Sequence, residues 1–196
     1  MAVVVQEFLN WSGRDIWVFG YGSLMWRPGF RYIDAHPARL FGYHRALCVR
    51  SMIHRGTPAN PGLVMGLKLG GSCVGRAYLV AAADALDVSD YLTWRELRRD
   101  TYRATACRLR LVDRGVDGIC FTVNSNSVQY SGNLSFAEMA DLVDKGVGSS
   151  GSSYDYLADA VAHFDEVGIN EHKLRRLLQT VREGRCGIVR AKSEAL

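Results

Sequence analysis

Residues 19–26 read Phe-Gly-Tyr-Gly-Ser-Leu-Met-Trp, and they continue an apolar run that begins at Ile16. Because Gly22 ends that run, it predicts a buried β-strand over residues 16–21. Two glycines and a serine directly after a strand allow backbone N–H groups to turn toward a small anion. The segment is not a P-loop, because no Gly-Lys-Ser/Thr follows, and a dinucleotide fingerprint would need glycine in place of Met25. A tight turn beneath an aromatic cluster explains the same residues, so the segment alone leaves both interpretations open.

Further short apolar segments, punctuated by glycines, predict more strands before residue 124. These segments are residues 39–50, 63–69, 73–80, 101–111 and 119–123. Gly70 and Gly71 stand between two of them, and a Gly-Gly pair in that position is typical of a hairpin turn. One helix is predicted among the strands, over residues 82–98 with Asp84 as its N-cap.

After residue 135 the apolar residues recur every three or four positions, which predicts helices. Ser135 and Glu138 have the spacing of a capping box, and the helix that they begin is expected to end near Lys145. Two further helices are expected to stop at Gly168 and Gly184. Their apolar faces consist of Tyr154, Leu157, Val161 and Phe164, and of Leu174, Leu177, Leu178 and Val181.

Strand patterns followed by helix patterns favour an α+β fold rather than a doubly wound α/β sheet. The chain has 196 residues, of which 48% are hydrophobic and 22% charged, and this composition is typical of a globular domain. We expect one domain over residues 1–196, with a core over about 15–184 and a loose tail over 185–196. No apolar run approaches the roughly 18 residues that a membrane span needs. The first ten residues lack the pattern of a signal peptide, so we expect a cytoplasmic protein without a membrane partner.

The composition also argues against a metal site and a nucleic-acid partner. The five cysteines and five histidines show no Cys-x-x-Cys or His-x-x-x-His spacing, and the cysteines are interpreted as reduced thiols. The net charge is +4, and seven arginines lie between residues 95 and 114. Glu96, Asp100 and Asp113 interrupt that basic stretch, and no nucleic-acid-binding motif accompanies it. We therefore expect neither a metal nor a nucleic acid to bind.

Two further residues are candidates for chemistry. Arg55 lies in a polar loop between strands, where it can hold a carboxylate, although turn chemistry explains that loop equally well. Glu96 shares a helical face with Leu92, four residues earlier, so it can point toward the core. A buried carboxylate there would have a raised pKa and could act as a general acid and base. The alternative is a solvated Glu96 that pairs with Arg99.

The chain resembles the ChaC-like γ-glutamylcyclotransferases in a series of segments that occur in family order. The segments are residues 17–30, 54–58, 61–63, 71–78, 91–96, 130–132 and 150–157. The resemblance implies an α+β fold with a small mixed, barrel-like sheet and flanking helices, and it implies no metal or organic cofactor. Members of this family cleave glutathione into 5-oxoproline and cysteinylglycine.

The resemblance also assigns roles to residues of this chain. It places the catalytic carboxylate at Glu96. It implies that the substrate loop consists of Tyr21, Gly22, Ser23 and Leu24, and we add Arg55 and Tyr130 as candidate substrate contacts. The chain departs from the family in having Asp100 and Thr101 where glycines are common, and Ser153 where asparagine is common.

The implied reaction is an intramolecular aminolysis. The α-amino nitrogen of the γ-glutamyl group attacks its own γ-amide carbonyl, with Glu96 as the general acid and base. Two alternatives remain at this point. The substrate is either glutathione or another γ-glutamyl amine or dipeptide, and a non-catalytic regulatory module that binds a small molecule would use the same pocket.

Overall fold

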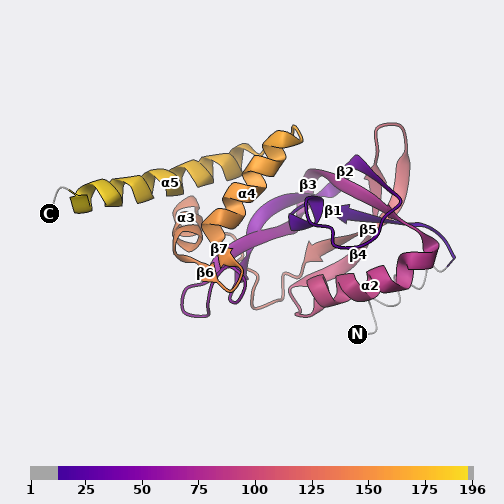
Figure 1. Ribbon diagram of the computed structural model, residues 1–196, viewed down its shortest axis with the longest axis horizontal. Coiled ribbons are helices and arrows are strands. Elements are labelled where there is room, and N and C mark those ends of the chain that lie inside the picture. Colours follow the sequence, from indigo (N-terminus) through magenta and orange to yellow (C-terminus); the bar gives the residue numbers. More distant parts are fainter. Residues whose placement is uncertain (1–12, 194–196) are drawn as a thin grey trace. The chain divides into compact units, whose positions relative to one another are not determined.

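The computed structural model describes residues 13–193, with side chains up to Arg185, and it divides into two compact units (Figure 1). The first unit consists of residues 13–46 and 65–130, and the second consists of residues 47–64 and 131–193. Two long strands, β2 (Asp34–Ser51) and β3 (Gly62–Val80), contribute residues to both units. The expectation of one domain over residues 1–196 stays a prediction.

A closed five-stranded barrel dominates the first unit. Its remaining strands are β1 (Ile16–Gly20), β4 (Tyr102–Arg110) and β5 (Gly115–Val123), and its order is β1-β3-β2-β4-β5, with β3 also pairing with β5. β1 is antiparallel to β3 and parallel to β5, and β4 and β5 form an antiparallel hairpin. All five residues of β1 are buried, because this strand has neighbours on both sides and a core beneath it. The prediction of an α+β fold with a barrel-like sheet is confirmed.

The hairpin predicted at Gly70 and Gly71 is wrong. β3 runs without interruption from residue 62 to residue 80, and the Gly70 carbonyl lies 2.8 Å from Nδ1 of His44 on β2. The two glycines have φ angles of +98° and +74°. Within a strand, such angles mark a local bend rather than a reversal of the chain. The two glycines therefore do mark a change in backbone direction. Whether that change is a hairpin turn or a bend depends on whether the strand continues past it.

The predicted helix over residues 82–98 consists of three short pieces. A 3-10 turn, η2 (Ala82–Asp84), leads into α2 (Ala85–Leu92), and a π-helical turn, η3 (Thr93–Leu97), follows it. Asp84 is the N-cap residue of α2, but its side chain makes no capping hydrogen bond. The π-helical turn contains Glu96, and such turns are frequent at functional sites.

The second unit contains the predicted C-terminal helices, which pack against one another (Figure 1). Their bounds are α3 (Phe136–Lys145), α4 (Ser153–Glu166) and α5 (His172–Ser193), and a two-stranded sheet of β6 (Val147–Gly148) and β7 (Gly151–Ser152) precedes α4. The capping box is confirmed, since Ser135 and Glu138 each accept a hydrogen bond from the other's backbone N–H. None of the described helices combines the length and the apolar composition that a membrane crossing requires.

The predicted end of the last helix at Gly184 is wrong. α5 continues past this residue to Ser193, so residues 185–193 are helical rather than a loose tail. A glycine inside a helix costs about 1 kcal/mol relative to alanine, but it does not remove a backbone donor as proline does. Residues 194–196, the end of the predicted tail, lie outside the described residues.

Candidate active site

The substrate-loop candidates form a tight turn directly after β1. A short 3-10 helix, η1 (Ser23–Met25), follows Gly22. The Met25 N–H donates to the Gly22 carbonyl at 2.8 Å, and the Arg27 N–H donates to the Ser23 carbonyl at 2.8 Å. Tyr21 and Leu24 are buried, whereas Ser23 is partly exposed. The turn therefore leaves Ser23 accessible, rather than the apolar side chains of Tyr21 and Leu24.

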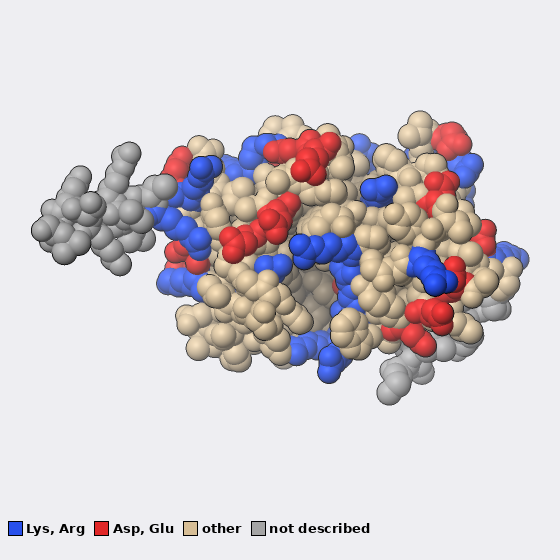
Figure 2. Space-filling model, in the orientation of Figure 1, with Lys and Arg blue, Asp and Glu red and all other residues tan. Residues whose placement is uncertain are grey.

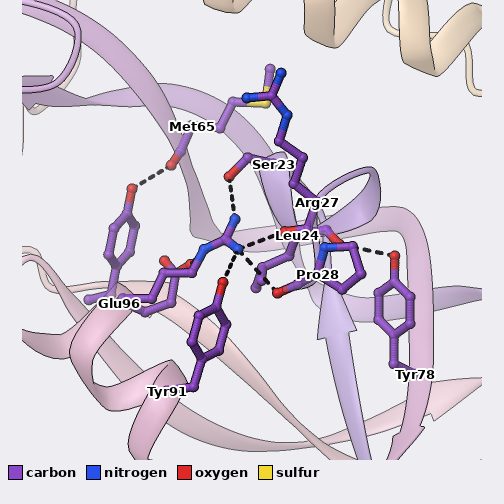
Figure 3. A network of polar contacts seen from close by, with 10 residues as sticks. Ser23, Leu24, Arg27, Pro28, Met65, Tyr78, Tyr91 and Glu96 are labelled. Carbon is purple, nitrogen blue, oxygen red and sulfur yellow. Dashed lines mark hydrogen bonds and ion pairs between the residues drawn. The ribbon is translucent and has the colours of Figure 1, made fainter. Parts of the chain in front are cut away.

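Two buried side chains from the barrel hold this turn from below. The Tyr78 hydroxyl lies 2.6 Å from the Met25 carbonyl and 3.0 Å from the Leu24 carbonyl (Figure 3). Burial raises the pKa of Tyr78 to about 12, so the phenol keeps the proton that it donates. Arg45, which is also buried, donates from Nε to the Tyr21 carbonyl and from Nη2 to the Val74 carbonyl. The backbone of the turn is thus fixed by hydrogen bonds from two strands.

Glu96 lies in η3 and is largely withdrawn from solvent, with its side chain 15% exposed. Its Oε1 lies 3.1 Å from Nε of Arg95. Burial raises the pKa of the Glu96 carboxyl, and the charge and hydrogen bond of Arg95 oppose that rise. Of the two environments considered for Glu96, the structure has the buried one, and the ion-pair partner is Arg95 rather than Arg99.

Arg95 connects Glu96 to the turn after β1, because its guanidinium contacts both Glu96 and Ser23. Its Nη2 donates to the Ser23 hydroxyl at 3.1 Å. Its Nη1 lies 2.6 Å from the Arg27 carbonyl, 3.1 Å from the Pro28 carbonyl and 2.8 Å from the Tyr91 hydroxyl. One guanidinium therefore contacts both the predicted catalytic carboxylate and the predicted substrate loop. The Glu96 carboxylate and the Ser23 hydroxyl both bind to the Arg95 side chain.

Sequence reasoning missed the residues that support this arrangement, namely Arg95, Tyr78 and Arg45. Arg95 and Tyr78 lie inside segments that resemble the family, but nothing in the sequence distinguishes them from other polar residues there. One local signal was available, since Tyr91 and Arg95 are four positions apart and neighbours on a helix meet at that spacing. The contacts to Ser23, Arg27 and Pro28 span about 70 residues of sequence and have no local signature.

Arg55 and Tyr130 are not part of the network around Arg95. Arg55 belongs to the second unit, where its guanidinium lies 5.4 Å from the centre of the Tyr156 ring and Nη1 donates to the Ser152 carbonyl at 3.3 Å. Tyr130 belongs to the first unit, where Lys68 lies 5.7 Å from the centre of its ring. Substrate contact by either residue stays a prediction.

The departures from the family pattern have clear local partners. The buried Thr101 donates from its hydroxyl to Oε1 of Gln129 at 2.6 Å. Asp100 is exposed, and its carbonyl accepts a hydrogen bond from Asn124. In the second unit Ser153 is fully buried, and its hydroxyl donates to the Leu63 carbonyl at 2.8 Å. It also accepts from the Leu63 N–H at 2.9 Å. The side chains of Thr101 and Ser153 are thus built into the fold by hydrogen bonds, whereas the bond at Asp100 uses a backbone carbonyl that glycine would also supply.

Two arginines of the predicted basic stretch have acidic partners. In the predicted basic stretch, Arg108 pairs with Asp117 at 2.8 Å and Arg114 with Asp113 at 3.6 Å. Acidic and basic side chains are interspersed over the face drawn in Figure 2.

Within residues 13–185, no group of three or more histidines, cysteines or carboxylates is placed to hold a metal ion. Cys48, Cys73, Cys107 and Cys120 form no disulfide bond within the described residues.

Comparisons with known proteins point to one family. The family described as ChaC-like protein matches residues 16–184. The chain is 33% identical to the glutathione-specific γ-glutamylcyclotransferase of Escherichia coli (strain K12), over 91% of this chain and 85% of that protein. It is 30% identical to the protein of the same name from Schizosaccharomyces pombe, over 73% of this chain and 79% of that protein. A crystal structure of a glutathione-specific γ-glutamyl cyclotransferase from yeast is similar, with a TM-score of 0.79 and 25% identity, over 86% of this chain and 96% of that one.

Proposed function

This chain belongs to the ChaC-like protein family, and from that premise we propose that it is a γ-glutamylcyclotransferase that cleaves glutathione into 5-oxoproline and cysteinylglycine. Its relatives in Escherichia coli and Schizosaccharomyces pombe carry the name of this activity. One structural observation carries the proposal. A largely buried carboxylate, Glu96, lies against a guanidinium that also binds Ser23 in the turn after β1.

In the proposed reaction the α-amino nitrogen of the γ-glutamyl group attacks the γ-amide carbonyl carbon of the same residue. A carbon–nitrogen bond forms and closes the five-membered lactam, and the original amide bond breaks and releases the amine of cysteinylglycine. At neutral pH the attacking nitrogen is an ammonium, so it must first lose a proton. Glu96 takes that proton and returns it to the leaving nitrogen, a contribution of typically about 10²–10⁴-fold. The attacking nitrogen loses a second proton as the lactam forms, and the released amine takes one up to become an ammonium. The raised pKa of the buried Glu96 supports this role, because it brings the carboxyl closer to the pKa of the groups with which it exchanges protons.

The turn after β1 is the proposed site for the glutamyl α-carboxylate. The N–H groups from Gly22 to Leu24 precede the first hydrogen bond of η1, and the Ser23 hydroxyl lies beside them. Such a turn can bind an anion, and a backbone fixed by Tyr78 and Arg45 does not have to reorganise when the charge arrives. Holding the glutamyl chain in an attack geometry supplies much of the remaining acceleration, because the nucleophile is tethered to the carbonyl.

The proposal is tested by mass-spectrometric detection of 5-oxoproline after incubation of the pure protein with glutathione. γ-Glutamyl-alanine and γ-glutamyl-lysine serve as alternative substrates in parallel reactions. Turnover of glutathione in preference to both supports the proposal. Preference for another γ-glutamyl compound changes the substrate, and binding without any turnover indicates a regulatory module.

Glu96→Gln tests the role of the carboxylate, because it keeps the side-chain size but cannot accept the ammonium proton. We expect turnover to fall by at least about 10²-fold while 5-oxoproline binding changes much less. Asp100→Asn is the matched control, since it removes an exposed carboxylate four residues away. Equal losses in both variants would contradict the assignment. The cytoplasmic location and the absence of nucleic-acid and membrane partners remain predictions from the sequence.

A further inference from the structure

We propose that Arg95 is the positioning residue of this site, which holds the Glu96 carboxylate and the turn at Ser23 in one fixed geometry and does not itself anchor the substrate. The inference rests on the proposed function, since it assigns a part in the same reaction. Arg95 is attractive at first sight as an anchor for a substrate carboxylate, because it is a cation beside the predicted binding loop. Its contacts argue for the other role.

The hydrogen-bond donors of Arg95 are nearly all occupied by the protein. A guanidinium has five N–H donors, one on Nε and two on each terminal nitrogen. Nε faces Glu96 at 3.1 Å, and Nη1 shares its two hydrogens among the carbonyls of Arg27 and Pro28 and the Tyr91 hydroxyl. Nη2 donates one hydrogen bond to the Ser23 hydroxyl. At most one donor remains, whereas a forked contact with a carboxylate needs two.

The contact between Arg95 and Glu96 occurs within an unusual backbone. Consecutive residues of an α-helix do not face each other, because each step rotates by about 100°. Arg95 and Glu96 nevertheless meet at 3.1 Å, and they do so within the π-helical turn η3. The side chain of Arg95 is 18% exposed, and a guanidinium so enclosed is much less mobile than one on the surface.

The surroundings of Arg95 are shaped to receive it. Tyr91, one turn earlier in α2, places its hydroxyl 2.8 Å from Nη1. That hydroxyl lies close to Gly29, where a Cβ atom would be only 2.1 Å from it, and Gly29 has a φ angle of +73°. Any other residue at position 29 would therefore both be strained and displace Tyr91. The segment from Arg27 to Gly29 thus follows the proposed substrate turn in the chain, and it also contacts the Tyr91–Arg95 pair.

The role of Arg95 has an electrostatic consequence for Glu96. The guanidinium charge favours the ionised carboxylate and partly offsets the effect of burial on the pKa of Glu96. The other titratable residues joined to this network are Tyr91 of α2 and Tyr78 of β3, through their hydroxyls, and Arg27 after η1, through its carbonyl. Removal of the Arg95 charge therefore raises the pKa of Glu96. Because a general base must be ionised, the acid limb of the pH profile of kcat/KM moves to higher pH.

The test compares Arg95→Met and Arg95→Lys with Arg99→Met. Arg99 is the control, since it is exposed, carries the same charge and lies four residues away. For Arg95→Met we expect kcat on glutathione to fall about 10²-fold, as misplacement by 1 Å can produce. We expect KM to change less than about threefold and the acid limb to shift upward. Arg95→Lys keeps the charge but loses the fork, so its acid limb should stay while kcat falls. A rise in KM with unchanged kcat would make Arg95 a substrate anchor, and unchanged kinetics would overturn the proposal.

Two further measurements keep the proposal testable. Tyr91→Phe removes a single acceptor and should lower kcat several-fold even if Arg95→Met does not fold. Carbon-13 NMR titration of the Glu96 carboxyl needs no turnover, and its pKa should rise in Arg95→Met but not in Arg99→Met. No rise in Arg95→Met would overturn the proposal. An inactive Glu96→Gln with a normal Arg95→Met defeats the positioning role alone, whereas an active Glu96→Gln defeats the proposed general base.

Discussion

The two units of the chain hold their functional and structural segments by different means. In the first unit, the turn after β1 is held by side chains that bind its backbone, namely Tyr78, Arg45 and Arg95. In the second, the loop around Arg55 and the segment before α4 approach so closely that only glycine fits between them. Side-chain hydrogen bonds leave a turn with exposed polar groups that can bind a ligand. Close backbone packing in the second unit instead leaves no room for a side chain at the glycines between the two segments.

Gly62→Ala should produce the largest effect in this comparison. A Cβ atom at Gly62 would lie 2.1 Å from the Arg55 carbonyl oxygen and 2.8 Å from Cβ of Ser153. Because a backbone atom must move, we expect a loss of more than about 3 kcal/mol in the free energy of unfolding, measured by urea denaturation. Gly184→Ala in α5 is the control, since nothing lies within 4 Å of its Cβ position, and it should gain up to about 1 kcal/mol. Similar small changes in both variants would contradict the close-packing account.

Tyr78→Phe tests the hydrogen bonds beneath the turn of the first unit. Without the hydroxyl, the carbonyls of Leu24 and Met25 lose a buried donor, which costs about 1–3 kcal/mol. Because the same turn is the proposed carboxylate site, turnover of glutathione should also fall. Tyr32→Phe is the control, as Tyr32 lies 5.0 Å from the Tyr78 ring but is 44% exposed. A loss of stability with unchanged turnover would show that the turn does not contact the substrate.

Ser153→Ala is the corresponding change in the second unit. It removes both hydrogen bonds to the backbone of Leu63, so we expect a similar loss of about 1–3 kcal/mol in thermal unfolding experiments. Turnover per folded molecule should remain at the wild-type value, in contrast to Tyr78→Phe. A fall in turnover at temperatures where the variant is fully folded would bring this segment into the catalytic site.

Glu96→Gln should change stability less than Ser153→Ala does, and it should stabilise the protein at neutral pH rather than destabilise it. Burial raises the pKa of Glu96 in the folded state above its unfolded value, so the folded protein binds the proton more tightly. The stability that follows from this is present at acidic pH and is lost as the pH rises through the folded-state pKa. The melting temperature of Glu96→Gln relative to wild type should therefore increase from pH 4 to pH 8. A difference that decreases with pH would mean that the ion pair with Arg95 outweighs burial.

Arg175→Met should have the smallest effect. Arg175 forms an ion pair with Asp165 in the second unit, and both side chains are more than 40% exposed. Exposed pairs contribute about 0–1 kcal/mol, so the midpoint of urea denaturation should move little. A loss comparable to that of Ser153→Ala would show that surface charges also hold the second unit together.

Several local elements of this protein follow from the sequence alone. The apolar run at residue 16 predicts β1, the spacing of Ser135 and Glu138 predicts the start of α3, and Gly168 predicts the end of α4. Each depends on residues a few positions apart, whose backbone geometry and hydrogen bonds are local. The ordered segments that resemble the family likewise led to Glu96 and to the turn at residues 21–24.

Only the tertiary structure decided what those elements do together. A Gly-Gly pair such as Gly70 and Gly71 is compatible with a hairpin turn and with a bend inside a strand. Here β2 lies beside the pair and β3 continues through it, so the pair forms a bend. From the sequence, Glu96 could pair with Arg99 in solvent or lie in a buried site. The fold places it beside Arg95, which also contacts Ser23, Arg27 and Pro28. These contacts join residues about 70 positions apart. Burial, pKa and hydrogen-bond partners depend on such distant contacts, because they are properties of the space around a side chain rather than of its neighbours in sequence.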